Sequence, residues 1–129
     1  MNLKDVREAL VAVEEDLMGG LAATDVFSTT SGMSIAGINS SPKSCALFNV
    51  VCQNIEKTIA KSGLPVPQYL AQTIIRLGAN GEVIICIVDI NKKYRWGLAV
   101  DSSKAQMGIL VSVVMPETTD RLRKALADK

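Results

Sequence analysis

The sequence contains no histidine, and its 129 residues include only three cysteines. Without histidine, the chain lacks the commonest general base and the commonest metal ligand. Cys45, Cys52 and Cys86 form no C-x-x-C pair and are odd in number, which argues against a disulfide framework and against a zinc site. These absences lower the expectation of an enzyme, and we predict no catalytic residue, no cofactor and no bound metal.

Aromatic residues are also scarce, at 4% against 48% apolar residues, so the core must be built mainly from aliphatic side chains. The 14 basic and 13 acidic residues leave a formal net charge of +1, which gives no field to attract nucleic acid. No apolar run approaches the ~20 residues of a membrane-spanning helix. The acidic start does not resemble a signal peptide, and we expect a cytoplasmic protein with one domain over residues 1–129.

Apolar periodicity and turn residues divide the chain into helices and strands. The run EVIICIVDI is apolar at both alternating sets of positions, which indicates a strand covered on both faces and hence a three-layer fold. Residues 107–115 are β-branched and fit a strand as well as a helix, and we favour a helical region broken near Pro116. The expected helices span residues 3–17, 44–61 and about 103–127, and the expected strands span 26–29, 33–36, 69–77, 82–90 and 94–101.

The helix over residues 44–61 has two apolar faces, whereas a surface helix needs only one. Leu47 and Val50 belong to the first face, Phe48 and Cys52 to the second. A second subunit would use the second face, and the weakly apolar strand 69–77 fits a sheet edge where another chain pairs. The predicted dimer interface is Phe48, Cys52, Ile55, Ile59, Ala71 and Thr73. The predicted partner surface is Asn49, Gln53, Glu56 and Lys57.

The stretch DVFSTTSGMSIAG, residues 25–37, is rich in serine and threonine and could suggest a nucleophile or a phosphate-binding loop. A catalytic serine needs a base within reach, and neither G-x-x-x-x-G-K-[ST] nor G-x-G-x-x-G occurs. A hairpin turning at Gly32 is the better interpretation. A carboxylate inside a strand is costly unless exposed or paired, so we expect Asp25 near the strand start or facing solvent.

The strand 94–101 begins with aromatic and basic residues. Tyr94 and Trp96 share one face, which favours core packing under a helix over a ligand platform. Lys92, Lys93 and Arg95 form a small basic patch, which we interpret as a solvated hairpin tip.

The element order and three segments resemble the roadblock family, which includes dynein light chains and bacterial and archaeal regulators of small Ras-like GTPases. The segments are VFSTTSGMSIAG, TIIRLGANGEVIICIVDINKKYRWGLAVD and SSKAQMGILV, and the resemblance covers nearly the whole chain. The chain departs from the family at Thr24 and Asp25, where a glycine and small apolar residues are common, and at Pro116, which interrupts the last helix.

The resemblance implies an α+β fold of three layers, α/β/α, with a five-stranded antiparallel sheet, one helix on one face and two on the other. It also implies no catalytic residues, a homodimer through the second helix and the edge strand, and a small Ras-like GTPase as partner. The expected function is therefore a non-enzymatic dimeric regulator or scaffold that modulates the nucleotide state of that GTPase. The alternative is a small-molecule-sensing or ligand-binding signalling domain of similar architecture.

Overall fold

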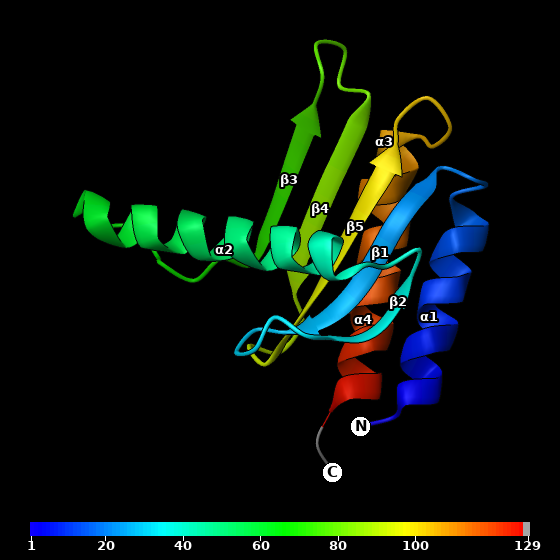
Figure 1. Ribbon diagram of the computed structural model, residues 1–129, viewed down its shortest axis with the longest axis horizontal. Helices are drawn as coiled ribbons and strands as arrows, with labels where there is room; N and C mark the ends of the chain where they lie inside the picture. Colours follow the sequence, from blue (N-terminus) through cyan, green and yellow to red (C-terminus); the bar gives the residue numbers. More distant parts are fainter. Residues whose placement is uncertain (128–129) are drawn as a thin grey trace.

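The computed structural model describes residues 1–127, which fold as five antiparallel strands in the order β2-β1-β5-β4-β3, with β2 and β3 at the two edges (Figure 1). The strands are β1 (Leu21–Ser28), β2 (Ser34–Ile38), β3 (Gln72–Leu77), β4 (Val83–Asp89) and β5 (Tyr94–Asp101). The helices are α1 (Leu3–Asp16), α2 (Pro42–Ser62), α3 (Met107–Ile109), the π-helix η1 (Leu110–Val114) and α4 (Met115–Leu126).

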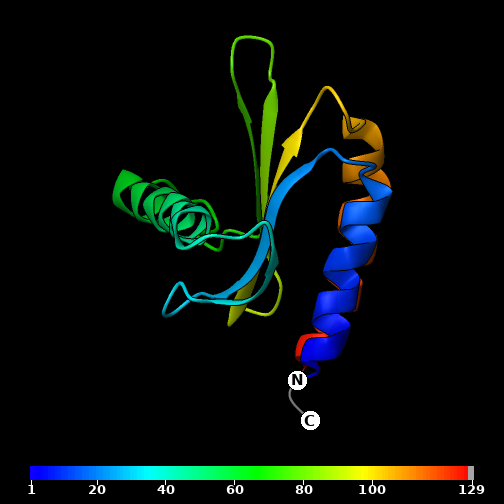
Figure 2. The ribbon, with the colours of Figure 1, turned by 45° about the vertical axis from the view of Figure 1, so that its right-hand side comes forward.

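The sheet is covered on both faces, as the apolar pattern of β4 predicts. Helix α2 crosses one face, and α1 lies beside the C-terminal helices on the other (Figure 2). Ile84 and Cys86 belong to the core under α1 and α4, whereas Ile85 and Ile87 belong to the core under α2. The expected three-layer α+β fold is therefore confirmed.

Local sequence signals fix the ends of α2. Ser41 and Ser44 form a capping box, in which each side chain accepts from the backbone N–H of the other residue at 3.1 Å. Pro42 suits the first turn because its missing N–H would have no intrahelical partner. Gly63 ends the helix with a φ of +69°, a conformation that favours glycine.

The C-terminal region is helical from Met107, and the alternative strand over residues 107–115 is wrong. The expected interruption takes the form of a π turn: the Met115 N–H bonds to the Leu110 carbonyl, five residues back. Pro116 has no N–H for the Ser112 carbonyl and its ring would clash there in a regular helix. The wider turn accommodates the proline, and α4 continues to Leu126.

Candidate interaction surface

Helix α2 lies on the sheet through the face that carries Phe48 and Cys52. Both side chains are 1% exposed and pack against Phe27, Ile85 and Ile87 of the sheet. The expectation that they face a second subunit is therefore corrected: this apolar face has an intrachain use that the helical pattern alone did not reveal.

The exposed apolar residues of α2 belong to the other face. Leu47 is 49% and Val50 is 48% exposed. Ile55 and Ile59 are half-buried, and with Asn54 and Thr58 they line a shallow hollow of about 250 Å³. Both isoleucines are therefore accessible to a second subunit, as the predicted interface requires.

The second half of α2 extends beyond β3, the edge of the sheet, while the β3–β4 hairpin projects past the part that α2 covers (Figures 1 and 2). On the α2 side, Leu77 is 47% exposed and Ile75 and Val83 are half-buried. Thr73 is also half-buried and Ala71 is exposed. Within residues 1–127, β3 pairs with no strand other than β4, so its outer edge is available to another strand.

The four predicted partner residues have different environments. Lys57 is exposed, and Gln53 is half-buried. Asn49 lies over the β1–β2 hairpin, because a Cβ on Gly32 would come within 2.8 Å of its Nδ2. Glu56 is tied to the protein's own sheet, since its Oε1 lies 2.6 Å from Nη2 of Arg95.

Asp25 is fully buried, so its expected exposure is wrong. Its Oδ1 accepts from the hydroxyls of Ser34 at 2.8 Å and Ser40 at 2.5 Å, and its Oδ2 lies 3.2 Å from the Ser44 hydroxyl. Gly37 leaves room for the carboxylate, because a Cβ there would come within 2.6 Å of Oδ1. These serines therefore tie the hairpin to the start of α2, and the hairpin itself turns at Gly32 as expected.

Strand β5 carries two neighbouring buried side chains with polar groups, those of Arg95 and Trp96. Trp96 lies in the core as expected, and its Nε1 donates to the Thr24 hydroxyl at 2.8 Å, which donates to the Gly97 carbonyl at 2.9 Å. Arg95 is only 6% exposed, so its assignment to a solvated hairpin tip is wrong. The alternation of a strand explains both positions, because Arg95 and Trp96 point to opposite faces of the sheet.

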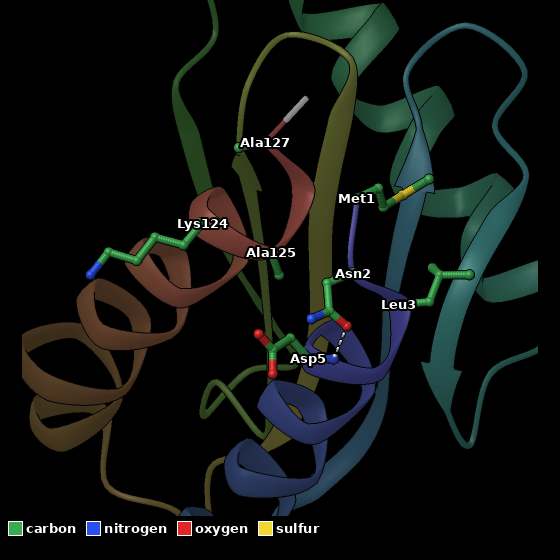
Figure 3. A pocket seen from close by; sticks show the side chains of 7 residues that line it. All are labelled: Met1, Asn2, Leu3, Asp5, Lys124, Ala125 and Ala127. Carbon is green, nitrogen blue, oxygen red and sulfur yellow. Dashed lines mark hydrogen bonds between the residues drawn. The ribbon is translucent and has the colours of Figure 1, made fainter. Parts of the chain in front are cut away.

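A hollow of about 690 Å³ lies where α1 begins and α4 ends (Figure 3). Asn2 accepts from the Asp5 N–H at 3.1 Å, and Lys124 points away from both residues. Among the residues that line this hollow, Asn2 is already used within the protein, where it caps α1.

A smaller hollow of about 340 Å³ separates the hairpin from the start of α2. Ser34 and Ser40 line it, but both hydroxyls donate to Asp25, and the Cys45 thiol contacts the Gly32 carbonyl at 3.1 Å. Its polar groups are therefore already used within the protein, which gives the ligand-sensing alternative little support.

The three cysteines are buried and free. Burial is the first cause that raises the pKa of Cys45 and Cys86, each to about 11, and the pKa of Cys52 is raised for the same reason. Within residues 1–127, no group of three or more His, Cys, Asp or Glu side chains could hold a metal ion. In the same range no helix is both long and apolar enough to cross a bilayer.

Comparisons with known proteins identify the fold. No family model and no curated protein matches the sequence. MglB of Myxococcus xanthus superposes with a TM-score of 0.76 at 12% identity, covering 98% of this chain and 93% of that one.

Two further structures are similar. A Roadblock/LC7 domain from Streptomyces avermitilis has a TM-score of 0.66 at 10% identity, covering 93% of this chain and 96% of that one. MglC from Myxococcus xanthus has a TM-score of 0.64 at 17% identity, with coverages of 95% and 99%. The chain therefore has the roadblock fold, as its sequence resemblance implied.

Proposed function

We propose that this chain is a non-enzymatic, homodimeric regulator or scaffold that binds a small Ras-like GTPase and modulates its nucleotide state. The roadblock fold and the sequence resemblance to regulators of such GTPases support the class of function. One observation carries the dimer: α2 overhangs the free edge strand, and the projecting hairpin beside it has uncovered apolar residues.

These two features complement each other across a two-fold axis at the β3 edge. Antiparallel pairing of β3 with its copy would extend the sheet and satisfy the free backbone groups. The overhanging end of each α2, with Ile55 and Ile59, would then cover Ile75, Leu77 and Val83 of the other subunit. Four of the predicted interface residues stay in the proposed interface: Ile55, Ile59, Ala71 and Thr73. Phe48 and Cys52 lie beneath α2 in the core and hold the helix on the sheet.

Sedimentation of two matched variants tests the dimer. Leu77→Glu places a charge in the proposed interface, whereas Val11→Glu changes a residue of similar exposure, 45% against 47%, on the opposite face of the sheet. We expect Leu77→Glu to raise the dimer dissociation constant at least about tenfold, a cost of about 1.4 kcal/mol, and Val11→Glu to leave it unchanged. A monomeric wild-type chain, or equal affinities in both variants, would contradict the proposal.

The GTPase would bind the side of α2 that faces away from the sheet. Ala46, Leu47, Val50 and Asn54 are exposed there and uncharged, and Gln53 and Lys57 lie beside them. A partner with switch loops could dock on this surface and have one loop conformation stabilised. Such an effect requires different affinities for the two nucleotide states of the GTPase.

Titration of the Ras-like GTPase encoded nearest to this gene, loaded with GDP or a GTP analogue, tests the partner. We expect tighter binding of the GTP form, and a loss of at least about tenfold for Val50→Glu but not for Val11→Glu. Equal affinity for the two states would reduce the role to a passive scaffold. Absence of binding would overturn the GTPase assignment and favour the ligand-sensing alternative.

A further inference from the structure

We propose that Arg95 is a positioning residue, which fixes the angle at which α2 crosses the sheet and thereby the place of the overhanging end. The inference gives a role to a buried cation that the proposed function does not use. It depends on that function only for its effect on dimerisation, since the angle of α2 is a property of a single chain.

Arg95 bridges the sheet and the helix. It belongs to β5, is 6% exposed, and places Nη2 at 2.6 Å from Oε1 of Glu56 on α2. Its Nε lies 3.7 Å from Oδ2 of Asp89 on β4 and makes no hydrogen bond. The guanidinium is therefore held between a helix carboxylate and a sheet carboxylate.

Asp89 extends the cluster to the segment between α2 and β3. Its Oδ1 accepts from the Tyr69 hydroxyl at 2.8 Å and from the Lys92 N–H at 2.8 Å. The Lys92 ammonium lies 5.5 Å from the centre of the Tyr69 ring. One cluster thus connects the helix, the loop that follows it and the two strands beneath.

The position of Glu56 along α2 explains why this contact sets an angle. Phe48 packs tightly on the sheet, since its ring would lie 2.5 Å from a Cβ on Gly97, and Cys52 packs on the sheet one turn further along. The apolar contacts of Phe48 and Cys52 hold the first half of α2, and the contact of Glu56, about 12 Å beyond Phe48, restrains the second half. A pivot of about 10° at Phe48 would move Ser62 by roughly 4 Å, enough to break the van der Waals contacts of the overhanging end.

The small net stability of a buried ion pair distinguishes a positioning role for Arg95 from a stabilising one. A buried ion pair adds little net stability compared with apolar side chains of similar volume, because desolvation offsets the attraction. The directions of its hydrogen bonds are nevertheless specific, whereas apolar contacts tolerate sliding. Replacing the whole cluster with neutral residues should therefore preserve folding and loosen the angle.

The test uses Arg95→Met/Glu56→Met/Asp89→Asn, which removes the buried cation together with both carboxylates that hold it and keeps a side-chain oxygen at position 89 to accept from the Tyr69 hydroxyl. Lys57→Met is the control, since it removes one charge from the same turn of α2. Glu56→Gln is a second variant, which keeps an acceptor for Arg95 should the triple variant fail to fold. Backbone N–H residual dipolar couplings report the angle between α2 and the sheet, and sedimentation reports the dimer.

We expect the residual dipolar couplings of the triple variant to become smaller along α2 and to stay unchanged in the strands. The dimer dissociation constant should rise at least about tenfold. Glu56→Gln should show a smaller loss of amplitude, and Lys57→Met none. Unchanged couplings along α2, or a loss of amplitude in helix and strands alike, would overturn the positioning role. If the wild-type chain is monomeric, the dimer proposal fails, but the couplings still decide the role of Arg95.

Discussion

The ring of Phe48 on α2 lies directly on the backbone of Gly97 in β5. A Cβ at position 97 would come within 2.5 Å of the ring, so any other residue would lift the helix. Phe27 of β1 stacks beside the same ring, with 6.3 Å between the two ring centres.

Gly97→Ala should therefore destabilise the fold by about 1–3 kcal/mol through overpacking. Gly108→Ala is the matched control, because a Cβ there has no neighbour within 4 Å and alanine favours a helix by about 1 kcal/mol. Urea unfolding measures both free energies. A Gly97→Ala protein as stable as wild type would show that α2 does not rest on this contact.

Asp25→Ala should cost about 1.5–3 kcal/mol of unfolding free energy, because the buried carboxylate and the hydrogen bonds it accepts from Ser34 and Ser40 are lost. Asp25→Asn should cost at least about 1 kcal/mol less, since its remaining oxygen can accept from Ser34 and Ser40. Asp16→Ala, at an exposed position of α1, is the control and should change stability by no more than about 0.5 kcal/mol. Equal losses for the alanine and asparagine variants at position 25 would argue against hydrogen bonding as the cause.

Thr24→Val should destabilise by about 1–3 kcal/mol, because the Trp96 N–H is left without its acceptor and the Gly97 carbonyl without the threonine donor. Trp96 is the only tryptophan, so its fluorescence reports this site and should shift with the loss of the hydrogen bond. Thr30→Val, on the exposed hairpin, should leave stability and spectrum unchanged. An unaltered emission in Thr24→Val would refute the contact.

The thiols of Cys45 and Cys86 should be unreactive in the folded protein. With a pKa of about 11, a thiol is about one part in a thousand thiolate at pH 8, and only the thiolate reacts. Alkylation should follow unfolding in guanidinium and should be slow without it. Rapid modification of either cysteine in the native protein would contradict this.

The same pKa shifts predict a pH dependence of stability. In the unfolded chain the thiols release their protons near pH 9, whereas in the folded chain they hold them until about pH 11. Unfolding therefore releases protons in this window, and the free energy of unfolding should fall as pH rises from about 9 to about 11. Because other groups titrate there too, the comparison is with Cys86→Ala, whose fall should be shallower.

Local signals in the sequence predicted the structure correctly where it depends on residues close to one another in the chain. Ser41, Pro42 and Gly63 fixed the ends of α2, and Gly32 fixed the hairpin turn, because caps and turns use contacts within a few residues. The alternation along β4 showed that the sheet is covered on both faces, since burial leaves a periodic pattern. Those signals, with the family resemblance, were enough for the three-layer fold.

Only tertiary structure decided which apolar face of α2 lies inside. Both faces qualify by periodicity, and the choice depends on Gly97, a residue far along the chain that makes room for Phe48. The π turn also depended on context, because residues 107–115 fit a strand by propensity and become helical where Leu110 and Val114 reach the core.

Outside residues 107–115, the sequence by itself determined the type and order of the elements, the mainly aliphatic core and the edge character of β3, because these follow from short-range periodicity and composition. Tertiary structure decided where the charges lie. Asp25 and Arg95 looked exposed because burying a charge is costly when considered alone. Their compensating groups are serine hydroxyls up to 19 residues away for Asp25 and Glu56, 39 residues away, for Arg95, and only the fold brings such distant partners together.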